Sequence, residues 1–376
     1  MEEREAKGRL RQLRPVAPAG PGRLMRDGRE LLDFSSNDYL GLAHHPLLVE
    51  RSCEWARELG TGSRASRLVT GTLDAHLAVE RKLAAFKGSE AALLFASGWQ
   101  ANATIFPALC ALAPKIAIFA DRLVHASIHH GIAAAGQRQV RFRHNDYDHL
   151  EELLEAKGRD ADIRLVVTES VFSMDGDRAD LERLSAIARK HDAFLVVDEA
   201  HATGVLGPKG AGLSAEIEHK PDLVMGTFSK ALGSFGAFVC GSAPLVDYLV
   251  NAASGLIYST ALPPPVLGAI DAALDIVPGM DKQRTDLARL SEKFRSGLHA
   301  LGLDCGASDT QIVPIMVGGE EETLKIAEIL EKSGILGIAI RPPTVPNGSS
   351  RIRFALSSVH SEKHVEQVLD VLGKAL

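Results

Sequence analysis

The sequence predicts an α/β fold, in which a mostly parallel, seven-stranded sheet with helices on both faces is followed by a smaller α+β domain. Continuous apolar runs alternate with helix-length amphipathic segments between residues 93 and 240, as in parallel strands that are covered on both faces. After about residue 278 the strands become shorter and alternate in polarity. We therefore expect an N-terminal arm over residues 1–42, a large domain over 43–277 and a small domain over 278–376.

Seven apolar runs are expected to form the large sheet. Most of them are continuous rather than alternating, so both faces of these strands should be buried. Helical patterns lie between them, for example at 149–158 and 180–191, and such alternation favours right-handed crossovers. The runs lie at residues 93–95, 116–119, 140–142, 165–167, 194–197, 223–225 and 238–240.

The two ends of the chain have different patterns. The first 33 or so residues are rich in Arg, Pro and Gly, and we expect no more than one helix there. Residues 281–301 and 321–333 have the pattern of amphipathic helices. Residues 351–356 alternate, which predicts a half-exposed antiparallel strand.

Composition excludes several classes of protein. The net charge of −6 argues against a nucleic-acid surface. The longest apolar stretch, 103–120, is interrupted by two prolines and a lysine, so we expect a core helix and a strand there and no membrane span. The charged first residues lack the apolar centre of a signal peptide, which favours a cytoplasmic protein. The four cysteines are far apart and there is no His-Glu-x-x-His sequence, so no metal is expected.

Polar residues follow several of the predicted strands. Asp198 and His201 follow the run at 194–197, and Thr227 and Lys230 follow the run at 223–225. In an open α/β sheet, ligands bind beyond the carboxyl ends of the strands. These side chains are therefore expected at one ligand-binding edge.

Two further strand ends contribute to the same edge. Gly98 follows the run at 93–95 and opens a helix, whose free N–H groups suit a phosphate. His125 follows the run at 116–119. A carboxylate can pair with a protonated ring nitrogen, and a lysine of lowered pKa can form an imine and remove an α-proton. With a stacked histidine, this combination predicts a pyridoxal-phosphate (PLP) site.

Two other motifs suggest alternative nucleotide-binding functions. The Asp-Glu-Ala-His sequence at 198–201 also occurs in helicases, which need a Gly-Lys-Ser or Gly-Lys-Thr phosphate loop. The only Gly-Lys pair is at 373–374, and Ala375 follows it, so this alternative is excluded. Residues 60–64 resemble half of a dinucleotide loop but follow no convincing strand.

Taken together, the motifs identify a family. The chain resembles the α-oxoamine synthases, which are fold-type I PLP-dependent transferases, along nearly its whole length. The resemblance rests on the combination of motifs at 37–42, 121–127, 172–177, 198–204, 227–230 and 258–260.

The resemblance implies a role for each residue at the cofactor. Lys230 would be the Schiff-base lysine and would shuttle the α-proton, Asp198 would pair with the ring nitrogen, and His201 with the ring hydroxyl. His125 would stack on the ring and, with Lys230 and Asp198, act in catalysis. The remaining cofactor residues would be Gly98, Trp99 and Thr227 at the phosphate, Ser173 beside the ring, and Ser259 and Thr260 from the second subunit of a homodimer whose active sites lie at the interface.

The resemblance also implies a reaction. Residues 340–346 are similar to the biotin-pathway branch of the family, which condenses L-alanine with a pimeloyl thioester to give 8-amino-7-oxononanoate. The thioester would be pimeloyl-CoA or pimeloyl-acyl carrier protein, and the sequence fixes neither the carrier nor the acyl-chain length. The alternative is a glycine-using sister enzyme of the 2-amino-3-ketobutyrate CoA ligase or 5-aminolevulinate synthase type.

Substrate residues follow from the same resemblance. Arg341 would bind the amino-acid carboxylate, and Thr344, Asn37 and His125 would lie near the substrate. An arginine of the N-terminal arm would also hold substrate. Arg11 is the better match for this residue, with Arg14 as the alternative.

Overall fold

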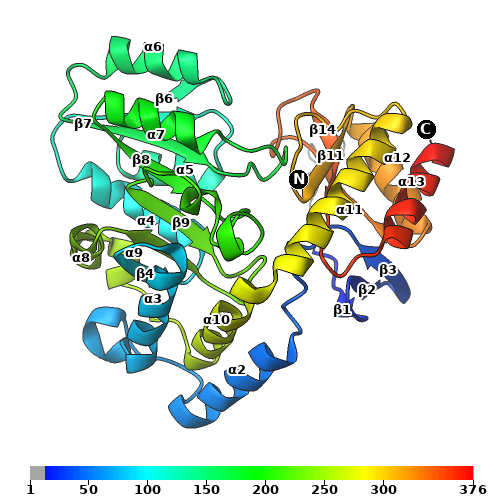
Figure 1. Cartoon of the computed structure of the whole chain (residues 1–376), viewed down its shortest axis with the longest axis horizontal. Helices are drawn as coiled ribbons and strands as arrows, with labels where there is room; N and C mark the ends of the chain where they lie inside the picture. Colours follow the sequence, from blue (N-terminus) through cyan, green and yellow to red (C-terminus); the bar gives the residue numbers. More distant parts are fainter. Residues whose placement is uncertain (1–12, 376) are drawn as a thin grey trace. The chain divides into compact units, whose positions relative to one another are not determined.

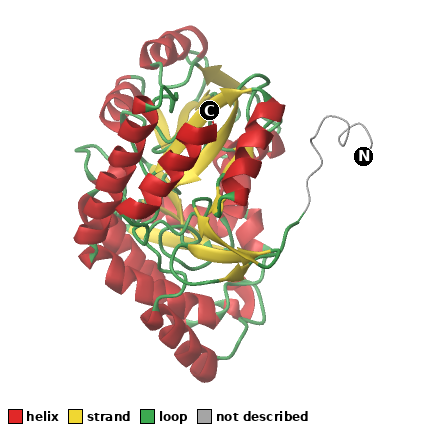
Figure 2. Cartoon of the chain, turned by 90° about the vertical axis from the view of Figure 1, so that its right-hand side faces the viewer, coloured by secondary structure: helices red, strands yellow, loops and turns green. Residues whose placement is uncertain are grey.

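The computed structural model describes residues 13–375 and divides into two compact units (Figure 1). The large unit contains Leu42–Phe172 and Ala179–Asp281. Of the described residues, the small unit contains 13–41, 173–178 and 282–375. Each unit has its own sheets, shown as yellow arrows in Figure 2.

The seven predicted strands all lie in one sheet of the large unit, which confirms the α/β fold. Strand β10 is antiparallel to both of its neighbours, and all other adjacent pairs are parallel. Parallel strands that are buried on both faces explain the continuous apolar runs. The order is β4 (Ala91–Phe95), β10 (Ala237–Gly241), β9 (Leu223–Thr227), β8 (Ala193–Asp198), β7 (Ile163–Glu169), β5 (Ile116–Asp121) and β6 (Gln139–Phe142).

Helices cover this sheet and bury its apolar side chains. One core cluster joins α4, α5, α8 and α9 to the strands through fully buried residues such as Ile105, Ile128 and Val167. The side chains of Asp146 and Asp180 cap α6 and α7, as the N-terminal ends of helices require. The helices are α4 (Gly98–Cys110), α5 (Ala126–Ala134), α6 (Tyr147–Lys157), α7 (Leu181–Lys190), α8 (Ala243–Ala252) and α9 (Ser254–Ile257).

The remaining elements of the large unit surround this core. Helix α10 packs closely against α2 and α3. The helices are α2 (Pro46–Leu59), α3 (Asp74–Lys87) and α10 (Pro264–Ile276), and the short turns of helix lie at Arg67–Gly71, Pro208–Gly210, Leu213–Ala215 and Val277–Gly279.

The small unit has two small sheets. The first has the order β1 (Ala17–Pro18), β2 (Arg23–Arg26), β3 (Arg29–Asp33) and β12 (Ile335–Leu336). The second is antiparallel and has the order β11 (Ile312–Gly318), β14 (Ser350–Ala355) and β13 (Ile338–Ile340). The helices are α12 (Glu320–Lys332), α13 (Glu362–Ala375) and α11 (Asp281–Ala300), which begins at the last residue of the large unit.

Residues 13–33 of the N-terminal arm form three strands. The helix allowed for within residues 1–33 stays a prediction, because residues 1–12 lie outside the described residues. The expectation for the strand at 351–356 was wrong in part. Strand β14 is antiparallel, but all six of its residues are buried rather than alternating. Its arginines are buried because each has an acceptor: Arg351 pairs with Asp175, and Arg353 donates to the carbonyl of Ser173.

Within residues 13–375, the structure contains no helix that has both the length and the apolar character needed to cross a bilayer.

Candidate active site

A cavity of about 200 Å³ lies beyond the carboxyl ends of β7, β8 and β9 in the large unit. It brings together seven of the side chains or backbone positions that the sequence predicts at the cofactor. We call it the Lys230 cavity. It is lined by Gly98, Trp99, Asn102, His125, Ser127, Glu169, Asp198, Ala200, His201, Met225, Thr227, Ser229 and Lys230.

Lys230 lies in a tight turn just after β9. The N–H of Gly233 donates to the carbonyl of Lys230 at 2.9 Å. Gly233 has a φ of +63°, and a Cβ there would lie 2.5 Å from the backbone carbon of Leu42, so this position needs glycine. The Nζ atom of Lys230 lies 2.9 Å from Nε2 of His201. The turn thus directs the amine into the cavity beside an imidazole.

Asp198 is the last residue of β8 and is buried. Its Oδ1 accepts from the N–H of Ala200 at 2.9 Å, and its Oδ2 accepts from Nδ2 of Asn102 at 3.0 Å. Both donors are neutral. The carboxylate can therefore balance the charge of a cation that enters the cavity.

His125 precedes α5 and caps it. Its Nδ1 accepts from the N–H of Ser127 at 3.2 Å and lies 2.7 Å from the Ser127 hydroxyl. Burial lowers the pKa of His125, Asp198 opposes this shift, and the positive charge of Lys230 adds to it. The imidazole is therefore kept neutral, as a ring that stacks on a flat cofactor can be.

Glu169 also lines the cavity, and the sequence prediction missed it. It ends β7 and is paired in register with Asp198 on the adjacent strand. Burial raises the pKa of Glu169 well above its ordinary value, and the charge of Asp198 raises it further. Its position at the end of an apolar run was the available signal. Asn102 was missed too, although it lies one helical turn after Gly98.

The N-terminus of α4 lies at the Lys230 cavity, where the sequence predicts a phosphate site. Ser97 caps the helix by accepting from the N–H of Gln100 at 3.1 Å. The first N–H groups of an α-helix have no acceptor within the helix and favour anions. Those of Gly98 and Trp99 belong to this first turn, and both residues line the cavity together with Thr227.

Ser259 and Thr260 lie elsewhere in the chain. They line a separate, smaller cavity together with Gln100 and His76. The hydroxyl of Ser259 accepts from Nε2 of Gln100 at 2.9 Å. One chain therefore does not bring these two residues to the Lys230 cavity.

Other predicted residues lie in the small unit. Nη2 of Arg353 donates to Oδ1 of Asn37 at 3.2 Å, and its Nε donates to the carbonyl of Ser173 at 2.6 Å. Arg341 and Thr344 share a turn in which the N–H of Thr344 donates to the carbonyl of Arg341 at 3.0 Å. Arg353, which the sequence prediction missed, thus connects two of the predicted residues.

The structure describes one of the two candidate substrate arginines of the N-terminal arm. Arg14 is bound in the small unit, where its guanidinium donates to Asp27 at 2.6 Å and to Glu331 at 3.0 Å. Arg11 lies outside the described residues.

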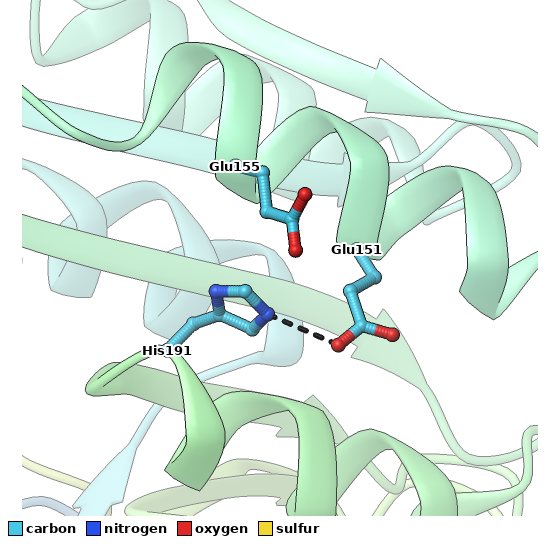
Figure 3. A group of neighbouring side chains, drawn as sticks. All are labelled: Glu151, Glu155 and His191. Atoms are coloured by element: carbon cyan, nitrogen blue, oxygen red, sulfur yellow. Dashed lines mark hydrogen bonds and ion pairs between the residues drawn. The ribbon is translucent and has the colours of Figure 1, made fainter.

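One group of side chains in the described part of the chain has the spacing of a metal site. Glu151 and Glu155 of α6 face His191 at the end of α7 (Figure 3). However, Glu151 accepts hydrogen bonds from Lys190 and from Nε2 of His191, the latter at 3.2 Å. Glu151 and His191 are therefore already paired with each other, and Glu151 also with Lys190.

The comparison with known families identifies the fold. The sequence matches the family of class I and II aminotransferases over residues 29–372. The chain belongs to this family. Fold-type I, which was predicted from the motifs, is thereby confirmed.

Relatives within the aminotransferase class I and II family agree with the finer resemblance. The 8-amino-7-oxononanoate synthase of Gluconacetobacter diazotrophicus is 57% identical over 371 residues, which cover 97% of this chain and 93% of that protein. The solved 8-amino-7-oxononanoate synthase of Francisella tularensis has a TM-score of 0.80 and 28% identity, and covers 92% of this chain and 97% of its own. The chain is thus similar to the α-oxoamine synthases, as predicted.

A third relative carries the cofactor. The structure of serine palmitoyltransferase from S. paucimobilis with a bound PLP–myriocin aldimine has a TM-score of 0.92 and 28% identity, and covers 100% of this chain and 95% of its own. This agrees with PLP as the cofactor of the family. The residues of the Lys230 cavity fit PLP. The cavity offers an amine for the aldehyde of PLP, a carboxylate for its ring nitrogen and a helix N-terminus for its phosphate.

Proposed function

We propose that this chain is a PLP-dependent acyltransferase that condenses L-alanine with a pimeloyl thioester, with loss of carbon dioxide. The product would be 8-amino-7-oxononanoate, an intermediate of biotin biosynthesis. The observation that carries the proposal is the single cavity that holds Lys230, Asp198, His201 and His125. The names of the relatives support the choice of reaction.

The side chains of the cavity have distinct tasks in this reaction. Bound PLP supplies an electron sink for negative charge at the α-carbon of the amino acid. Asp198 holds the ring nitrogen in its protonated form, which maintains the sink. Lys230 is the point of attachment, and its amine carries the α-proton. His201, 2.9 Å from that amine, orients it and binds the ring hydroxyl, while the neutral ring of His125 covers the cofactor face.

The substrates need cationic anchors, because alanine and the pimeloyl group both carry carboxylates. We assign Arg341 to the carboxylate of alanine, with Thr344 and Asn37 nearby, and Arg11 to the N-terminal contact. The ion pairs of Arg14 with Asp27 and Glu331 support Arg11 over Arg14 for this contact.

We also propose that the active form is a cytoplasmic homodimer. Ser259 and Thr260 would then reach the phosphate of the neighbouring subunit. Four exposed apolar side chains support such an interface: Leu68, Val69, Phe235 and Tyr258, the last of which is 84% exposed. The four cysteines are free thiols, in keeping with a reducing compartment.

A product assay tests the reaction. The purified protein, loaded with PLP, is incubated with pimeloyl-CoA or pimeloyl-acyl carrier protein and with alanine, glycine or serine in turn. We expect mass spectrometry to detect 8-amino-7-oxononanoate with alanine and not with glycine or serine. Products from glycine but not from alanine would instead establish the sister activity, and the carrier that supports turnover identifies the acyl donor.

A further inference from the structure

A chain of buried hydrogen bonds connects the floor of the Lys230 cavity to His125. Its centre is Asn102 on α4, which is 1% exposed. Nδ2 of Asn102 donates to Oδ2 of Asp198 and to Oγ of Ser127, both at 3.0 Å. Ser127 is fully buried, and its Oγ lies 2.7 Å from Nδ1 of His125. Both N–H groups of one amide are therefore used inside the site.

The chemistry of its partners requires an amide at this position. The carboxylate of Asp198 only accepts hydrogen bonds, so the nitrogen of the amide must face it. An aspartate in place of Asn102 would put a second carboxylate against the first. A leucine would leave Oδ2 of Asp198 and Oγ of Ser127 without this donor, although it would fill the same space.

Helix packing places the amide between its partners. Helices α4 and α5 approach so closely that a Cβ on Gly131 would lie 2.3 Å from the backbone oxygen of Asn102. This glycine lets the two helices meet at the residue that bridges them. Ser127 lies one turn before Gly131 on α5. Residues four apart share one face of a helix, so Ser127 also faces α4.

The hydrogen-bond directions fix the tautomer of His125. The Ser127 hydroxyl accepts from Asn102, so its own hydrogen is available for Nδ1 of His125. The N–H of Ser127 also donates to Nδ1 at 3.2 Å. An atom that accepts these bonds carries no proton, so the neutral imidazole carries its hydrogen on Nε2.

We infer that Asn102 is a positioning residue. It couples the orientation of the Asp198 carboxylate to the tautomer of His125. Through its bond to Asp198 it holds the carboxylate in the Lys230 cavity. Through the Ser127 hydroxyl it reinforces the Nε2-protonated tautomer of His125, which the N–H of Ser127 also favours. Its effect on PLP rests on the proposed function, whereas its effect on His125 does not.

The first experiment measures the tautomer without cofactor or substrate. Histidine labelled with ¹⁵N is incorporated into the PLP-free protein, and the nitrogen shifts of His125 are assigned with a His125→Gln variant. We expect the Nε2–H tautomer in the wild type and a mixture of both tautomers in Asn102→Leu. Thr104→Val, a buried substitution in the same helix, should leave the wild-type spectrum unchanged. An unaltered His125 signal in Asn102→Leu, in a protein that melts as the control does, would overturn the inference.

The second experiment uses the affinity for PLP as a function of pH. Asn102→Leu and Asn102→Asp should each weaken PLP binding about tenfold or more at pH 8. In Asn102→Asp the introduced carboxyl becomes a donor when protonated, so its affinity should recover towards wild type as the pH falls. The charged and titratable groups that line the cavity with it are Asp198, Glu169, His125, His201 and Lys230. Asn102→Leu retains all five and so controls for their titration.

The outcomes separate this inference from the proposed reaction. Equal pH dependence in the two variants would refute the amide's role even in an enzyme that makes the expected product. A shifted tautomer together with pH-dependent recovery would support it even if the substrate proved to be glycine.

Discussion

Asp198 and Glu199 are adjacent carboxylates at the end of one strand, but their environments differ. Asp198 lines the Lys230 cavity and is held there by the neutral donors Asn102 and Ala200. Glu199 is fully buried outside the cavity and forms an ion pair with Lys87 at 2.5 Å. Successive side chains of a strand point to opposite faces. The same strand end therefore places one carboxylate in the cavity and the other against the loop at residues 211–214. We call these the cavity side and the fastening side.

The fastening side is built around Glu199. Its Oε1 accepts from the N–H of Ser214 and its Oε2 from the Ser214 hydroxyl, both at 2.8 Å, and Lys87 also donates to the carbonyl of Ala211. Gly212 has a φ of +96°, and a Cβ there would lie 2.2 Å from Oε2 of Glu199. The comparison indicates that changes on the cavity side should affect chemistry, and changes on the fastening side should affect stability.

The largest effect is expected at Lys230. Lys230→Ala should lower turnover on the order of 10⁴-fold or more, because both the attachment point and the base are lost. Borohydride reduction of the wild-type holoenzyme, followed by peptide mass spectrometry, should place the label on this residue. The variant should unfold in urea as the wild type does. A label at another lysine would contradict the assignment.

On the fastening side, Lys87→Met should destabilise the protein by about 3–5 kcal/mol, because it leaves the buried charge of Glu199 without its partner. The measurement is the free energy of unfolding from urea titration of the PLP-free protein. Lys87→Met combined with Glu199→Gln should recover part of the loss, since no unpaired charge then remains. If Lys87→Met alone had the wild-type free energy of unfolding, the ion pair would not hold this loop.

On the cavity side, Asp198→Asn should slow the exchange of alanine's α-proton with solvent about 10²- to 10³-fold, because the ring nitrogen loses its charged partner. NMR of alanine in deuterated buffer measures this exchange directly. The unfolding free energy should change much less than in Lys87→Met. Exchange at the wild-type rate would refute the role of the carboxylate.

The smallest effect is expected from Ser214→Ala. It removes one hydrogen bond to Glu199 but keeps the backbone N–H that binds the same carboxylate. A loss of about 2 kcal/mol in unfolding free energy is expected for a hydrogen bond to a charged group. Proton exchange at alanine should stay at the wild-type rate, and a slowed exchange would erase the distinction between the two sides.

The sequence predicted those parts of the molecule that follow from local patterns. Apolar runs located the seven strands, and the rule that ligands bind at carboxyl ends located Lys230, Asp198 and His125. Glu169 was missed because its importance depends on strand register, which pairs it with Asp198. Asn102 was missed because its partners come from β8 and α5. Strand β14 was misjudged because the acceptors that let its arginines be buried are far away in sequence.

The antiparallel strand β10 has a consequence for the length of any ligand that the sheet can hold. It lies between β4 and β9, so the ends of those two strands are separated by two strand spacings, roughly 10 Å. The helix that starts after β4 and the amine that follows β9 therefore sit at a distance that the sheet itself sets. If PLP binds as proposed, a pyridoxal without its phosphate arm would reach the amine but leave the helix end unused, and we expect it to bind more weakly.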